Sequence, residues 1–257
     1  MDATTFSDLA KKGYNRIPVV HTSLADLDTP LSVYLKLARG PYTYLLESAQ
    51  GGEKWGRYSI IGLPARTVLR VIGDRITVET DGEVVESLVS DDPLRFIEEF
   101  QARFKVPQLP ELPRFYGGLV GYFGYDTVRY TEKRLRASTP PDTLGTPDIL
   151  LMVSEDVVVF DNLKAQMQLI SLVDPADPDN YQKTMETLQD RAQSLLQAAP
   201  PINETQTNQP VEESDCVSEF GEEPFKQAVE TIREYTRAGD VMQVVLAQRM
   251  SLPFGSE

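Results

Sequence analysis

The sequence has 257 residues, and its 25 Lys plus Arg against 39 Asp plus Glu give a formal net charge of −14. This acidic balance, without a dense basic run, argues against nucleic acid and anionic membranes as partners, and no apolar stretch approaches the roughly 20 residues that span a bilayer. His21 and Cys216 are the single His and the single Cys, so a zinc site of such ligands and a disulfide are both excluded, and a cytoplasmic location is expected.

The first part of the chain is predicted to consist of short strands. Runs of apolar and β-branched residues bounded by turn residues indicate successive strands at 42–47, 57–62, 66–72, 75–80 and 83–89. The pairs Gly73-Asp74 and Asp81-Gly82 suit tight turns with positive φ. The expected arrangement is one antiparallel meander.

Helices and a hairpin are predicted next. The spacing of apolar residues predicts helices at 93–104 and 177–199. Between them, 149–160 and 166–173 are expected to form a hairpin joined around Asp161-Asn162. Helices mixed with antiparallel strands, without alternating βαβ units, indicate the α+β class, with antiparallel sheets packed against helices.

A change of composition divides the chain. Residues 192–225 contain no Lys, Arg or His, but they hold seven Asp or Glu and several prolines. Such a segment is typical of a linker, and Cys216 within it is interpreted as incidental. The sequence therefore predicts an N-terminal region at 1–191, an acidic linker at 192–222 and a further element at 223–257.

The last 35 residues predict one helix and one strand. A helix of about 15 residues begins near Phe225 and ends at Gly239, a residue typical of helix C-termini. Residues 241–252 are expected to form a strand that enters a core. One helix and one strand cannot bury their apolar faces alone, so we expect an incomplete second domain and interpret the chain as a fragment of a longer one.

The first motif of chemical interest is Leu45-Leu46-Glu47-Ser48. It ends an apolar strand with a carboxylate beside a hydroxyl, a pair that suits an ammonium group. The alternative interpretation is an exposed strand end at which Glu47 forms an ion pair with Lys54 or Arg57. Taken alone, these four residues favour the exposed strand end.

Two further motifs are less specific. The glycine-rich segment 116–126 lacks the spacing and the Lys of a phosphate-binding loop, so its glycines are interpreted as allowing close strand packing. Gln243 is flanked by Val and Met, where burying an unpaired amide would cost about 1–3 kcal/mol. It is therefore either satisfied structurally or faces a polar cavity. His21 has no suggestive catalytic partner, and Trp55 is interpreted as a lid over the core.

Four segments together resemble a known family. Residues 45–48, 56–62, 116–126 and 239–249 are similar, in order and spacing, to the chorismate-utilising enzymes, and among them to the large component of anthranilate synthase. This resemblance covers nearly the whole chain from about residue 30, apart from the linker. It implies an N-terminal region that binds tryptophan as feedback inhibitor and an incomplete C-terminal chorismate-binding domain. The implied reaction adds ammonia to chorismate and eliminates pyruvate to give anthranilate.

The resemblance also assigns roles to residues. Ser48 matches the family's tryptophan-contacting serine and Glu47 its neighbouring acid. Gln243 matches the active-site position at which water-adding relatives carry a Lys as general base, and a neutral amide there favours ammonia as nucleophile. The family's Mg²⁺ ligands fall beyond residue 257, so no metal ligand is expected in this chain. The expected partner is a glutamine amidotransferase small subunit, and the chain alone is expected to be inactive.

Two rival functions are weighed against this one. The large component of aminodeoxychorismate synthase shares the Gly-Asp-x-x-Gln segment, but the complete Leu-Leu-Glu-Ser and Gly-Arg-Tyr-Ser pair favours the tryptophan pathway. The other rival is a stand-alone amino-acid-sensing module without catalysis.

Overall fold

The computed structural model describes residues 1–47, 56–139, 141–199 and 212–253. The chain divides into two compact units, Met1–Pro200 and Pro201–Glu257, and each is described by itself. The strands of the first unit are β1 Ile17–Leu24, β2 Tyr44–Leu46, β3 Tyr58–Gly62, β4 Thr67–Ile72, β5 Arg75–Thr80, β6 Glu83–Val89, β7 Gly118–Phe123, β8 Ile149–Ser154, β9 Asp156–Asp161 and β10 Gln166–Val173. Its α-helices are α1 Ala3–Lys11, α2 Pro30–Leu37, α3 Pro93–Ala102, α4 Val128–Thr131 and α5 Asn180–Ser194.

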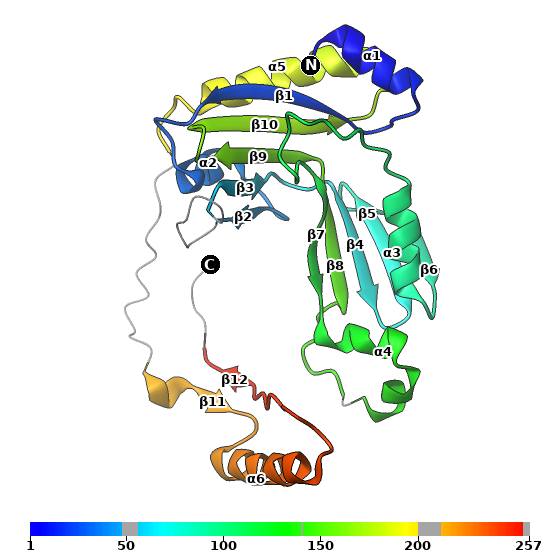
Figure 1. Ribbon diagram of the computed structural model, residues 1–257, viewed down its shortest axis with the longest axis vertical. Coiled ribbons are helices and arrows are strands. Elements are labelled where there is room, and N and C mark those ends of the chain that lie inside the picture. Colours follow the sequence, from blue (N-terminus) through cyan, green and yellow to red (C-terminus); the bar gives the residue numbers. More distant parts are fainter. Residues whose placement is uncertain (48–55, 140, 200–211, 254–257) are drawn as a thin grey trace. The chain divides into compact units, whose positions relative to one another are not determined.

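The strands described in the first unit form two antiparallel sheets. The first sheet has the order β1-β10-β9-β3-β2, and the second has the order β6-β5-β4-β8-β7 (Figure 1). Helices pack against both sheets, which confirms the predicted α+β class. The predicted hairpin of β9 and β10 and the turns at Gly73 and Asp81-Gly82, with positive φ, are also present.

The single meander predicted for 42–89 is wrong. β2 and β3 belong to the first sheet, whereas β4, β5 and β6 form consecutive hairpins in the second. The physical reason lies in the connections. Tight turns join β4 to β5 and β5 to β6, but the segment between β3 and β4 contains Pro64, which lacks an N–H, and no turn pair.

The strand predicted at 149–160 is in fact two strands. β8 ends at Ser154 in the second sheet and β9 begins at Asp156 in the first, so the chain crosses between the sheets at Glu155 (Figure 1). We call this position the crossover. Its side chain is half-buried, between two strands that are almost wholly buried.

The core formed by the described residues consists of three apolar clusters. In the first, α1, α2 and α5 cover one face of the first sheet, where Val19, Val158 and Leu169 are buried. In the second, α3 packs on the second sheet through Phe96, Ile97 and Phe100 (Figure 1). The third covers the other face of the first sheet with residues 112–116, including Phe115 and Tyr116.

The second unit contains helix α6 Glu222–Ala238 and a short strand pair, β11 Val217–Ser218 with β12 Met250–Ser251. Gly239 ends α6 with a φ of +84°, as expected for a left-handed C-cap. The strand predicted at 241–252 is wrong apart from the β12 residues. No strand in the described part of the chain pairs with 241–249, and an isolated strand has no ladder to hold it.

Candidate functional site

The first candidate residue, Glu47, follows directly after β2. This edge strand has three residues, and it pairs with β3 through Leu45 and Ile61 and their neighbours. Glu47 is exposed at the end of the strand. Ser48, Lys54 and Trp55 lie outside the described residues, so the structure places the carboxylate of the predicted pair and not the hydroxyl.

Arg57, where the chain returns to β3, is engaged by Asp161 and not by Glu47. Its Nε lies 3.0 Å from Oδ1 and its Nη2 lies 2.7 Å from Oδ2 of Asp161, a two-pronged ion pair. These hydrogen bonds from Arg57 hold the pKa of Asp161 below its usual range and raise the pKa of Arg57. The guanidinium also lies 4.8 Å from the ring centroid of Tyr58. The exposed strand end of the alternative interpretation is therefore confirmed, but its ion pair between Glu47 and Arg57 is not, and Lys54 lies outside the described residues.

The turn between β9 and β10 anchors the same end of the sheet. The Asn162 backbone N–H donates to the Arg57 carbonyl at 2.8 Å, and its side-chain amide donates to the Gly56 carbonyl at 3.0 Å. Gly56 and Arg57 are thus bonded to residues more than 100 positions later. Glu47 and Gly56 therefore lie at the same end of two paired strands, β2 and β3.

β2 is attached to the second sheet by a tyrosine. The Tyr44 hydroxyl lies 2.8 Å from the Ser154 hydroxyl, at the last residue of β8, and Ser154 is only 1% exposed. The ring crosses β3 at Gly62, where an added Cβ would lie 2.0 Å from the ring carbon Cε1. Burial raises the pKa of the Tyr44 hydroxyl above its ordinary value.

A second tyrosine makes a similar attachment just before β2. Tyr42 has a φ of +58°, a left-handed conformation that is uncommon for an aromatic residue. Its hydroxyl accepts a hydrogen bond from Arg70 on β4, whose guanidinium lies 5.6 Å from the Tyr42 ring centroid. Arg70 also forms a 2.6 Å ion pair with Glu79 on β5. The contacts with Arg70 offset the cost of the backbone conformation.

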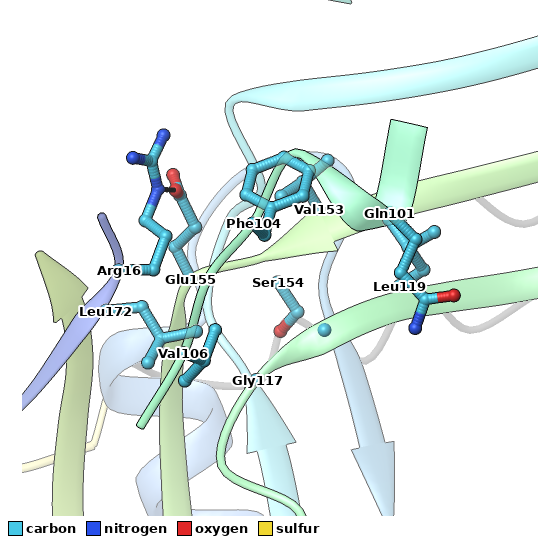
Figure 2. A pocket seen from close by; sticks show the side chains of 11 residues that line it. Arg16, Gln101, Phe104, Val106, Gly117, Leu119, Val153, Ser154, Glu155 and Leu172 are labelled. Atoms are coloured by element: carbon cyan, nitrogen blue, oxygen red, sulfur yellow. Dashed lines mark hydrogen bonds and ion pairs between the residues drawn. The ribbon is translucent and has the colours of Figure 1, made fainter. Parts of the chain in front are cut away.

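A cavity of about 170 Å³ lies beside the crossover. Figure 2 shows Arg16 and Glu155 side by side at one side of it and Gln101 and Leu119 at the other. The Arg16 Nε lies 2.6 Å from Oε1 of Glu155, and its guanidinium is 5.4 Å from the Phe104 ring centroid. The remaining walls are mostly apolar, and they include two glycines of the segment 116–126 but neither Glu47 nor Gln243. The residues that form them are Val106, Gly117, Gly118, Val153, Ser154 and Leu172.

The other candidate residues from the sequence lie in β7, in β1 and in the second unit. The interpretation of the glycine-rich segment is confirmed at Gly121 in β7, where an added Cβ would lie 1.9 Å from the Leu150 carbonyl oxygen of the neighbouring strand. His21 is half-buried within β1, opposite Leu169. Gln243 is exposed in the second unit and lies outside any strand, so the burial cost predicted for its amide does not arise there.

The described residues form neither a membrane-spanning helix nor a cluster of metal ligands. None of the helices in that part of the chain combines the length and the apolar character needed to cross a bilayer. The same residues contain no cluster of three or more His, Cys, Asp or Glu side chains that could hold a metal ion.

Residues 43–257 match the family described as chorismate binding enzyme. This match includes Glu47, the Arg57–Asp161 pair, the first unit from residue 43 onward and the whole second unit. The chain belongs to the chorismate binding enzyme family. Membership fits the four ordered segments that carry the resemblance in the sequence.

Two curated bacterial relatives are similar over almost the whole chain. Anthranilate synthase component 1 from Pseudomonas putida is 54% identical over 99% of this chain, and that from Pseudomonas aeruginosa is 52% identical over 99%. This chain covers 52% of each of these relatives, so it spans about half their length. A crystal structure of anthranilate synthase component I from Streptococcus pneumoniae is 27% identical, with a TM-score of 0.57 over 91% of this chain and 49% of that one.

Sequence reasoning missed Tyr44, Ser154 and Asp161. One signal was available, because a glycine inside an apolar strand, such as Gly62, often marks a close approach of another group. The partners of Tyr44 and Arg57 lie 110 and 104 residues away along the chain. No local pattern reports such pairs.

Proposed function

We propose that the chain is part of an anthranilate synthase component 1. The proposed reaction converts chorismate and ammonia to anthranilate and pyruvate, a carbon–oxygen lyase reaction in tryptophan biosynthesis. The observation that carries the proposal is the 54% identity to the Pseudomonas putida protein of that name over 99% of this chain. Because the chain spans about half of that relative, the activity belongs to the longer protein. We place this protein in the cytoplasm, with a glutamine amidotransferase small subunit as its ammonia-supplying partner.

The proposed regulator is tryptophan, bound at Glu47 and Ser48. A free amino acid carries an ammonium group that needs an anionic acceptor, and Glu47 offers an exposed carboxylate at the end of an anchored sheet. Ser48 would add a hydroxyl beside it. Feedback inhibition then follows if ligand binding at this strand end disfavours the catalytically competent state.

Gln243 is proposed to line the chorismate site. Its neutral amide cannot remove a proton from water, so water is not activated at this position and ammonia is favoured as the nucleophile. Mg²⁺ is the proposed cofactor of the longer protein. The described residues lack a carboxylate cluster that fits the ion, so its ligands are assigned to the part of the relatives that this chain does not span.

A chimaeric protein tests the proposed function. Residues 1–257 replace the matching half of the Pseudomonas putida component 1, and anthranilate fluorescence is followed with chorismate, ammonium and Mg²⁺. We expect product formation that tryptophan inhibits, and no product from the 257-residue chain alone. A folded chimaera without activity, or product from the chain alone, would contradict the proposal.

The effector site is tested by substitutions in that chimaera. Ser48→Phe should abolish tryptophan inhibition and leave uninhibited turnover nearly unchanged, because a ring would occupy the ammonium position. Glu47→Gln should raise the half-inhibitory tryptophan concentration about 10- to 100-fold, since a charge-assisted hydrogen bond is lost. Glu83→Gln, at an exposed carboxylate on β6, is the matched control and should leave inhibition unchanged. Unaltered inhibition in both site variants would remove the assignment.

A further inference from the structure

We propose that Tyr44 is a positioning residue for the effector site, which fixes the strand that carries Glu47 through its hydroxyl bond to Ser154. This inference rests on the proposed function, because it concerns how tightly tryptophan is held. It assigns Tyr44 no contact with the ligand and no part in the reaction.

β2 has few backbone contacts that fix its position. It is the edge strand of the first sheet, it contains three residues, and Leu46 at its end is 52% exposed. A pairing of this length with one neighbour leaves the strand free to fray at its exposed end. A carboxylate that must meet a ligand in a defined geometry needs a further attachment.

Tyr44 supplies this attachment. Its ring crosses β3 in the space left by the missing side chain of Gly62, and its hydroxyl reaches the buried Ser154 hydroxyl at 2.8 Å. Ser154 is the last residue of β8 and adjoins the crossover, so its backbone is held by the second sheet. Glu47 lies three residues after Tyr44, about 10 Å along an extended chain.

Tyr42 reinforces the same connection. It contacts Arg70 on the second sheet, and its carbonyl accepts a hydrogen bond from the Ala65 N–H at 3.2 Å. Two tyrosines, at positions 42 and 44, therefore join the chain around β2 to the other sheet. Of these two, Tyr44 lies within the strand itself, so its hydroxyl determines most directly where Glu47 is presented.

Loss of the Tyr44 hydroxyl has a specific expected effect. Phe at this position keeps the ring over Gly62 but leaves the strand without its bond to Ser154. Glu47 would then sample several positions, and tryptophan would have to select the competent one at a cost in affinity. Chorismate turnover without inhibitor should not change, because β2 is assigned no part in the reaction.

The test uses the chimaera described above with Tyr44→Phe, Ser154→Ala and the double variant. We expect each single variant to raise the half-inhibitory tryptophan concentration about tenfold, with kcat and KM for chorismate within about twofold of the parent. The double variant should have the same half-inhibitory tryptophan concentration as either single variant, since both substitutions remove the same hydrogen bond. Tyr122→Phe is the matched control. In the parent chain the hydroxyl of Tyr122, on β7, donates to the Pro147 carbonyl at 2.9 Å, and its loss should leave inhibition unchanged.

Several outcomes would overturn the inference. Unchanged inhibition in Tyr44→Phe and Ser154→Ala would do so, as would additive losses in the double variant or an equal fall in kcat. If Ser48→Phe abolishes inhibition while Tyr44→Phe does not alter it, the proposed function stands and only the role of Tyr44 fails. A parent chimaera that tryptophan does not inhibit would overturn both.

Discussion

At Gly121, two strands approach so closely that no side chain fits between them. An added Cβ would meet the Leu150 carbonyl oxygen at 1.9 Å, and a backbone atom cannot move aside as a flexible side chain can. This contact explains why position 121 of the glycine-rich segment is a glycine. The sequence could predict close packing here, but it could not name the opposing atom.

We predict that Gly121→Ala lowers the free energy of unfolding by about 3 kcal/mol, the upper part of the range for overpacked sites. Gly73→Ala is the control, because its turn has a φ of +57° and open space around the added Cβ, and it should cost about 1 kcal/mol. Urea denaturation of both variants measures the difference. Equal losses in the two variants would contradict the assigned crowding.

The ion pair of Arg57 and Asp161 predicts a dependence of stability on pH. The native pKa of Asp161 is lowered by the Arg57 hydrogen bonds, whereas the unfolded value is about 3.9. The stabilisation is therefore complete above the unfolded pKa and is lost as the pH falls through the native pKa. Asp161→Asn should flatten this loss, and Arg57→Lys, which keeps the charge without the fork, should retain part of it.

Denaturant unfolding between pH 6 and pH 2 measures this contribution (about two units on either side of the unfolded pKa). A variant Asp161→Asn with the same acid dependence as the parent chain would contradict it.

The carboxylate of Glu47 could be singled out from the sequence because it ends a strand beside a hydroxyl. Asp161 could not, since its partner Arg57 is 104 residues away.

At the scale of the elements, the crossover joins the two sheets. The half-buried Glu155 is bound by Arg16, which precedes β1, at 2.6 Å, and Arg16 also lies 3.2 Å from Asp174 after β10. Three segments of the first unit therefore meet at one guanidinium. The pair is partly shielded from water, unlike most ion pairs at the surface.

We predict that Arg16→Ala lowers the free energy of unfolding by about 1.5 kcal/mol or more, because two carboxylates lose their partner and Phe104 loses a packing neighbour. Arg95→Ala is the matched control. Its i,i+4 pair with Glu99 on α3 is exposed, so stability should be unchanged within experimental error. Thermal and urea unfolding measure both variants, and equal effects would contradict the role of Arg16.

Element type was more predictable than element pairing. β3, β4, β5 and β6 lie close to their predicted positions, because apolar alternation and turn residues are local signals. The distribution of these strands over two sheets was not predictable, since it depends on contacts between distant segments. At 241–249 the apolar run favoured a strand, but a strand requires a neighbour to pair with, and the described residues supply none.

At the scale of the whole molecule, the two units differ in their interior. Among the described residues, every buried apolar side chain lies between Phe6 and Leu195, within the first unit. Helix α6 of the second unit has exposed apolar residues, including Val229 and Tyr235. The first unit therefore holds the part of the core that the structure describes.

We predict that residues 1–200 fold without the rest of the chain. Thermal unfolding of 1–200 and of 1–257 should give one cooperative transition each, with midpoints within about 2 °C, because the described core is common to both. The denaturant m-values should also agree closely. A non-cooperative transition in the shorter chain would show that residues 201–257 contribute to the core.

The crossover restricts how this protein can change length. Side chains alternate between the two faces of a strand. Adding or deleting one residue at position 155 would therefore turn the core-facing side chains of one of the two strands to the opposite face of its sheet. Insertions tolerated during evolution would then be confined to the turns and connections elsewhere, and the run from 149 to 161 should keep an invariant length among relatives that share both sheets.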